Sequence, residues 1–181
     1  EDEVLLKQYM EDLRWKMEDG KRTKLILVPH EINEEHLHSI FQLFQGRYTT
    51  YSAISGPVPA ISRRNILQHA DVLVMDTIGL LSSVYNFGHA AYIGGGFGVG
   101  IHNTIEAAVY GLPVVFGPNY QHFREAKGLI EAGAARSIKN YEELEAALET
   151  ALDQHEIIGA KAAAYVQSEL GATDKIFKDL F

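Results

Sequence analysis

The stretch that decides the fold runs from Tyr92 to Arg124 and reads YIGGGFGVGIHNTIEAAVYGLPVVFGPNYQHFR. It begins as a short apolar strand and continues into five glycines within the seven residues 94–100. A helical pattern follows, then a Gly-Leu-Pro turn, a second buried strand and a polar loop. A glycine-rich turn between a strand and a helix is where parallel sheets hold anionic ligands. The stretch therefore predicts one wall of an anion-binding site.

Strands and helices alternate on both sides of this stretch. Apolar runs typical of buried parallel strands predict strands at 24–30, 48–52, 71–76, 90–93, 113–116 and 135–138. Helices are expected at 4–18, 33–45, 61–68, 78–87, 103–110, 123–132, 140–153, 156–169 and 173–180. This alternation on short loops predicts an α/β fold with a doubly wound, Rossmann-like parallel sheet of six strands. No linker or repeat interrupts it, so residues 1–181 are expected to form a single domain.

The composition excludes several classes of function. The 181 residues carry a formal net charge of −8, with 16 Lys+Arg against 24 Asp+Glu and no basic run, which argues against a nucleic-acid partner. The absence of cysteine excludes disulfides and thiolate metal sites. No apolar run approaches the roughly 18–20 residues of a membrane span. The chain begins at Glu1 within a helical pattern, so we expect a fragment of a longer protein.

Four loops with unusual residues follow the predicted strands, at the sheet edge where open α/β proteins bind ligands. They are His30-Glu31, 76–79, 94–103 and 117–124. The glycine loop within 94–103 has the composition for positive φ angles and close backbone approach. It does not match a dinucleotide fingerprint, because the spacing is ambiguous, the loop follows the fourth strand, and no Walker lysine is present.

Asn103 and Glu106 open the helix after the glycine loop, and their spacing has two interpretations. They can form a reciprocal capping pair, with Asn103 as N-cap and Glu106 at the third helical position. Alternatively, Glu106 accepts two hydrogen bonds from vicinal ribose hydroxyls, a task that suits a carboxylate. Asn103 would then cap the helix and also reach the ligand.

Thr77 and His30 also have two interpretations each. The backbone amides of Thr77, Ile78 and Gly79 suit a phosphate or a base edge at a helix start, or Thr77 is a plain N-cap. His30 is either a partly charged phosphate contact or a structural histidine. No metal site or catalytic triad is predicted: the HExxH spacing is absent, His36 and His38 do not share a helix face, and no nucleophile elbow surrounds the serines.

Taken together, the motifs resemble the C-terminal half of a GT-B glycosyltransferase, and more closely the 3-deoxy-D-manno-octulosonic acid (Kdo) transferase family. In order along the chain, the matching motifs are Val-Pro-His-Glu at 28–31, Asp-Thr-Ile-Gly-Leu-Leu at 76–81, Tyr-Ile-Gly-Gly-Gly-Phe at 92–97, His-Asn-Thr-Ile-Glu-Ala-Ala at 102–108, Gly-Leu-Pro-Val-Val-Phe-Gly-Pro at 111–118 and Phe-Arg-Glu at 123–125. Two positions depart from the family pattern. His30 stands where many relatives carry arginine, and Leu80 where many carry an acidic residue.

The resemblance implies a donor-binding domain for CMP-Kdo, used in lipopolysaccharide biosynthesis. It implies a lipid A precursor as acceptor at the cytoplasmic side of the inner membrane, inversion at the anomeric centre, and neither metal nor cofactor. Asn103 and Glu106 would bind the ribose of CMP, with backbone near 78–79 and 95–96 holding cytosine and phosphate. The implied donor-nucleotide-binding residues are His30, Thr77, Ile78, Gly79, Gly95, Gly96, His102, Asn103 and Glu106.

No catalytic residue is expected in this chain, because the family's base lies in an N-terminal domain that the chain does not contain. The isolated chain is therefore expected to be soluble and inactive. Apolar surface after Glu156 could make it dimeric, an expectation that light scattering can check, and Trp15 lies either on the surface or against a neighbouring domain. Two alternatives stay open: a UDP-sugar transferase or epimerase of the same fold, and a non-catalytic α/β docking module.

Overall fold

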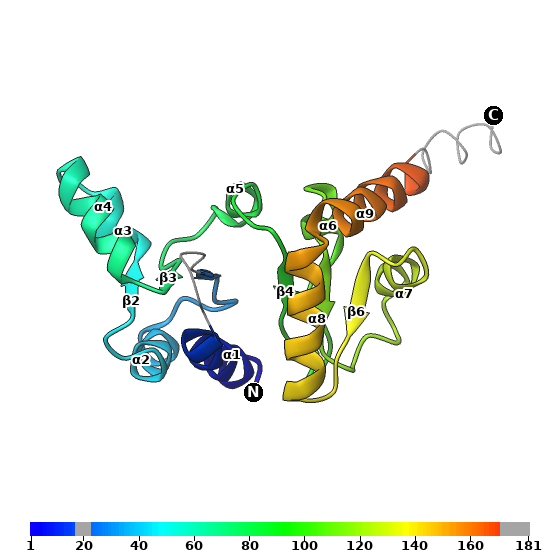
Figure 1. Cartoon of the computed structure of the whole chain (residues 1–181), viewed down its shortest axis with the longest axis horizontal. Coiled ribbons are helices and arrows are strands. Elements are labelled where there is room, and N and C mark those ends of the chain that lie inside the picture. The colour runs from blue at the N-terminus through cyan, green and yellow to red at the C-terminus, as the bar shows by residue number, and fades with distance from the viewer. Residues whose placement is uncertain (17–22, 171–181) are drawn as a thin grey trace. The chain divides into compact units, whose positions relative to one another are not determined.

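The chain divides into two compact units in a computed structural model that describes residues 1–16 and 23–170. Glu1 and Glu3–Val84 form the first unit, and the second contains Asp2 and the chain from Tyr85 onward. The helix expected at 173–180 and the side chain of Trp15 lie outside the described residues. Figure 1 shows the helices and strands, and each unit is described by itself below.

The first unit contains a parallel sheet whose middle strand is the last of the three in sequence. β1 (Leu25–Leu27) and β2 (Tyr48–Thr50) both pair with β3 (Val72–Val74), so the strand order is β1-β3-β2. The carboxyl ends of all three strands therefore meet at one edge. The helices of this unit are α1 (Asp2–Lys16), α2 (Glu34–Leu43), α3 (Tyr51–Ser55) and α4 (Ala60–His69).

Apolar residues of the predicted strands and helices make the core of the first unit. Val74 of β3 and Ile40 of α2 are completely buried, and Leu6 and Met10, four residues apart on one face of α1, are also buried. The carboxylate of Asp71 is also buried, where it is compensated by the guanidinium of Arg47 at 2.6 Å. A buried carboxylate needs such a partner, because desolvation of an unpaired charge is costly.

The second unit repeats the pattern with helices on a parallel sheet. β5 (Val114–Phe116) lies between β4 (Ala91–Ile93) and β6 (Ala135–Ser137). All three residues of β5 are buried, as expected for the middle strand of a covered parallel sheet. The chain passes from the first unit to the second within α5 (Leu81–Tyr85). The helices that follow are α6 (Ile105–Val109), α7 (Arg124–Glu131), α8 (Tyr141–Asp153) and α9 (His155–Glu169).

Packing in the second unit brings α8 onto β5 and brings α9 against α6 and α7 (Figure 1). Leu129 of α7 and Leu144 of α8 are completely buried. The helix expected at 140–153 is confirmed, and Asn140 caps it: its side chain accepts a hydrogen bond from the Glu143 amide at 2.9 Å. The carboxylate of Glu143 in turn accepts from the Lys139 amide, one residue earlier than the reciprocal capping pattern requires.

The predicted α/β class and its six parallel strands are confirmed, with one difference in how the strands pair. They form two hydrogen-bonded sheets of three strands, with β1 at the edge of one and β4 at the edge of the other. The strand predicted at 48–52 also ends at Thr50, because the Thr50 hydroxyl caps α3 by accepting from the Ala53 amide. The prediction that residues 1–181 form a single domain is not tested by these observations.

Candidate functional site

The glycine loop at 94–100 folds back on itself through backbone hydrogen bonds. The carbonyl of Gly95 accepts from the amides of Gly98 and Gly100 at 2.9 and 3.2 Å. The amide of His102 donates to Gly94 at 3.1 Å and closes the loop. Gly95 has a φ of +88°, and a Cβ there would overlap the Gly100 carbonyl. Only glycine fits this position, because both its backbone conformation and the space around it exclude a side chain.

Gly96 has a different structural reason to lack a side chain. A Cβ on Gly96 would lie 2.6 Å from the backbone of Gly117, which follows β5. The backbone amide of Asn119 donates to the Gly96 carbonyl at 2.9 Å, and the Asn119 side-chain amide donates to the Gly98 carbonyl at 2.6 Å. The 117–124 loop thus braces the glycine loop. The glycine loop was predicted to let the backbone approach a ligand closely. In the structure, the close approach is between the backbones of Gly96 and Gly117. Contact of Gly95 and Gly96 with a ligand stays a prediction.

Asn103 and Glu106 contact each other, but not as the predicted reciprocal cap. The Asn103 side chain accepts from the Ile105 amide and donates to the Glu106 carboxylate, both at 3.0 Å. The capping interpretation is wrong in this detail: α6 begins at Ile105 with Thr104 as its N-cap. Asn103 instead closes a turn two residues long, as asparagine side chains do in Asx-turns. His102, Asn103 and Glu106 are all exposed, so the pair presents polar groups to solvent.

The pKa of Tyr85 is affected by burial and by the negative charge of Glu106. Burial raises the pKa of Tyr85 above its ordinary value of 10.0, and the charge of Glu106 raises it further. The Tyr85 ring also packs against Tyr110, with centroids 5.8 Å apart. Glu106 therefore has an aromatic, partly buried neighbour on one side and open solvent on the other.

In the first unit, Asp76 and Ser52 form a polar contact where β2 and β3 end. The Ser52 amide donates to Asp76 at 2.9 Å, and its hydroxyl donates to the second carboxylate oxygen. Burial by itself would raise the pKa of Asp76, but the hydrogen bonds from Ser52, together with smaller effects of the Asp76 backbone and the Thr50 side chain, outweigh it and lower the pKa from its ordinary value of 3.8. Asp76 is thus held as a charged carboxylate at the edge where a ligand was predicted.

Thr77, Ile78 and Gly79 lie in a turn after β3 and not at a helix start. α5 begins only at Leu81, so both the N-cap interpretation and the helix-start amides predicted for Thr77 are wrong. The reason is Gly79, whose φ of +89° is incompatible with a right-handed helix. Ile78 is 90% exposed, and the Thr77 hydroxyl is buried with no hydrogen-bond partner within the described residues. A buried hydroxyl of this kind can accept or donate to an incoming ligand.

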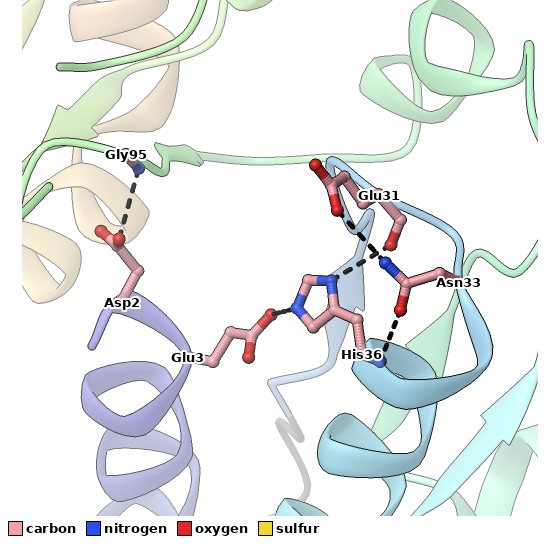
Figure 2. Close-up of polar contacts among 6 residues, drawn as sticks. All are labelled: Asp2, Glu3, Glu31, Asn33, His36 and Gly95. Carbon is pink, nitrogen blue, oxygen red and sulfur yellow. Dashed lines mark hydrogen bonds and ion pairs between the residues drawn. The ribbon is translucent and has the colours of Figure 1, made fainter. Parts of the chain in front are cut away.

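His30 is exposed just beyond β1, and the loop after it is fixed by His36. Figure 2 shows the ring nitrogens of His36 facing the Glu31 carbonyl at 3.1 Å and the Glu3 carboxylate at 2.8 Å. Asn33 caps α2 by accepting from the His36 amide, which confirms the predicted start of that helix. These contacts hold the 31–33 loop against α1 and α2, and thereby position the backbone that follows His30.

Two polar residues of these loops were missed individually by the sequence analysis. Ser52 was read as the end of a strand, although β2 and β3 are neighbours and their ends meet. Asn119 lay inside a loop already singled out, yet nothing local indicated that it would hold the glycine loop 21 residues earlier. Within the parts of the chain that the structure describes, no group of three metal-ligating side chains occurs. Nor is any described helix long and apolar enough to cross a membrane.

Comparison with solved structures identifies the class of fold. The C-terminal CMP-Kdo binding domain of WaaA from Acinetobacter baumannii superposes with a TM-score of 0.72, over 91% of this chain and 83% of that chain. The sequence identity is 19%, so the likeness concerns the fold. It confirms the predicted fold, that of the C-terminal half of a GT-B enzyme. No family model matches the chain.

Relatives found by sequence comparison indicate the protein family more specifically than the fold does. The 3-deoxy-D-manno-octulosonic acid transferase of Aquifex aeolicus is 37% identical over 76 residues, which are 41% of this chain and 22% of the relative. The enzyme of the same name from Chlamydia pneumoniae is 30% identical over 125 residues, 66% of this chain and 29% of the relative. The chain thus spans less than a third of the curated relatives it matches. It is related by sequence to the Kdo transferases, and the resemblance read from its motifs is confirmed.

Proposed function

We propose that this chain is the donor-nucleotide domain of a glycosyltransferase that moves Kdo from CMP-Kdo to a lipid A precursor. The relation to Kdo transferases over two thirds of the chain carries this proposal. The fold of the Acinetobacter CMP-Kdo binding domain supports it. The whole enzyme would act at the cytoplasmic side of the inner membrane, with its catalytic base supplied by an N-terminal domain. The donor would bind without a metal or other cofactor.

The residues of the second unit supply the nucleotide contacts in this proposal. The exposed carboxylate of Glu106 accepts the two ribose hydroxyls, and Asn103, already bonded to Glu106, orients it. Backbone amides of the braced loop near Gly95 and Gly96 bind the phosphate, helped by His102. Because hydrogen bonds hold this loop in place before binding, little conformational entropy is lost when the nucleotide arrives.

The first unit supplies further candidates in its strand-end loops. The Thr77 hydroxyl, for which the described residues offer no hydrogen-bond partner, and the backbone of Ile78 and Gly79 are proposed to contact the cytosine or phosphate. His30 takes the place of an arginine in the family pattern and would contact phosphate most strongly when protonated.

Calorimetric titration of the chain with CMP and UMP tests the donor. We expect weak binding with a preference for CMP, and Glu106→Gln should weaken CMP binding by about tenfold, the magnitude of a lost hydrogen bond to a charged group. Glu131→Gln, on α7, makes the same charge change away from the loops and should leave affinity unchanged.

The other outcomes separate the alternatives. A preference for UMP would indicate a UDP-sugar enzyme of the same fold, and no binding of either nucleotide at millimolar concentration would contradict the donor site. If Glu106→Ala lowers the free energy of unfolding by about 1 kcal/mol but leaves CMP affinity intact, its role is structural, as for a helix cap.

A further inference from the structure

Two histidines of the second unit are in ring contact with each other. His89 lies in the segment between α5 and β4, and His155 is the first residue of α9. Their ring centroids are 5.1 Å apart, and the ring planes cross at 87°. His89 comes before β4 and the glycine loop follows it, so the pair lies at the other end of that strand from the proposed donor loops. The proposed function therefore uses neither imidazole.

The spacing of the two rings is that of imidazoles bound to one metal ion. Histidine nitrogens lie about 2.0–2.1 Å from a zinc ion, and tetrahedral angles then hold two ring centroids about 5 Å apart. Rings bound in this way can cross steeply, as those of His89 and His155 do. An edge-to-face contact between aromatic rings has a similar spacing. The surroundings of the ring nitrogens distinguish the two interpretations.

The ring of His155 is oriented as that of a metal-binding histidine is. Its Nδ1 faces the Leu152 carbonyl at 3.1 Å. A carbonyl oxygen only accepts hydrogen bonds, so Nδ1 carries the proton and Nε2 has the lone pair of the neutral ring. Metal-bound histidines almost always make such a hydrogen bond with the second nitrogen, because it fixes the tautomer and the ring orientation. His155 is also half-buried, so packing confines the ring.

The exposed side chain of His89 can supply a second nitrogen to the same ion. Rotation about its side-chain bonds can direct a ring nitrogen toward Nε2 of His155. No third metal-ligating side chain joins the pair within the described part of the chain, so water would complete the coordination. An open site of this kind suits ions that favour imidazole, such as Zn²⁺ and Cu²⁺, over Mg²⁺, which favours oxygen ligands.

We propose that His89 and His155 together bind one divalent transition-metal ion. The ion links the segment before β4 to the start of α9, two parts of the chain that are distant in sequence. Binding of a ligand to the folded state alone stabilises that state, so the ion is expected to stabilise the second unit. This site is separate from the donor nucleotide and does not depend on the proposed function.

Titration of the whole chain with Zn²⁺, Cu²⁺ and Mg²⁺, followed by calorimetry and by NMR of the histidine rings, tests the proposal. We expect Cu²⁺ to bind more tightly than Zn²⁺, and the ring signals of His89 and His155 to change together. His89→Gln and His155→Gln should each weaken Zn²⁺ binding by at least about tenfold, because even the loss of an outer-shell partner costs that much. His69→Gln is the matched control, since its ring also faces a carbonyl, that of Asn65 at 2.7 Å, but lies in the first unit.

The Mg²⁺ titration separates a specific site from the general attraction of cations to a chain with a net charge of −8. Mg²⁺ should leave the ring signals unchanged, and Zn²⁺ should raise the Tm of the natural chain but not that of His155→Gln. The proposal is overturned if Mg²⁺ binds as tightly as Zn²⁺, if either His89→Gln or His155→Gln keeps its full affinity, or if neither Zn²⁺ nor Cu²⁺ binds at millimolar concentration. Ring signals that change only at other histidines would also overturn it, and this measurement needs no variant.

Discussion

At the scale of single residues, Asp76 shows how a neighbouring strand changes the chemistry of a loop. Burial acts to raise the pKa of its carboxyl group, but two hydrogen bonds from Ser52, with smaller effects of the Asp76 backbone and the Thr50 side chain, bring the pKa below its ordinary value. A carboxyl group whose pKa is lower in the folded state stabilises the fold above its unfolded-state pKa. That contribution is lost as the pH falls through the folded-state pKa.

We therefore expect Ser52→Ala to lower the free energy of unfolding by about 1 kcal/mol at pH 7, because the carboxylate loses the hydrogen bond from the Ser52 hydroxyl. The difference from the natural sequence should begin to shrink as the pH falls below about 4, the ordinary pKa of an aspartate, and should disappear only below the lower folded-state pKa of Asp76, where the carboxyl group is protonated in both states. Urea unfolding over a pH series measures it. Ser39→Ala, at an exposed position of α2, is the control. A difference that is the same at pH 3 and pH 7 would show that the contact with Asp76 does not carry the effect.

At the scale of elements, the contact between α6 and α9 depends on glycine. Gly159 lies inside α9, where alanine normally stabilises a helix by roughly 0.5–1 kcal/mol. Here, however, a Cβ on Gly159 would overlap the carbonyl oxygen of Gly111, just after α6. That oxygen belongs to the backbone and cannot rotate away, so the steric cost exceeds the gain in helix propensity.

Gly159→Ala should consequently destabilise the chain by about 1–3 kcal/mol, the usual cost of overpacking. Chemical denaturation monitored by circular dichroism measures the change. Ala160→Gly, at an exposed position of the same helix, isolates the propensity effect and should cost roughly 0.5–1 kcal/mol. A stabilised Gly159→Ala protein would mean that α6 and α9 separate at little cost.

At the scale of the whole molecule, the question is whether the two units unfold together. Each has its own parallel sheet and its own buried residues, yet the continuous alternation of strands and helices predicts one domain. If that prediction is right, Leu129→Ala should lower the protection of amides in β3 and β5 by the same free energy, about 2–5 kcal/mol for a completely buried leucine.

Native-state hydrogen exchange measures this coupling strand by strand. Ile66→Ala, at a more exposed position of α4, is the control and should have a much smaller effect. Loss of protection in β5 alone, with β3 unchanged, would establish that residues 1–84 and 85–170 are separate cooperative units.

The sequence by itself determined the α/β class, the six parallel strands, the helix starts at Asn33 and Asn140, and the relation to Kdo transferases. These follow from periodicity, capping residues and motif order, all of which act over a few neighbouring residues. The tertiary structure decided the strand pairing and the structural reason for glycine at 96. It also decided the hydrogen bonding of Asp76. In each case the contacts join residues about 20 or more positions apart, as between Gly96 and Gly117 or Ser52 and Asp76. No local pattern records such contacts, because they depend on which strands and helices become neighbours in the fold.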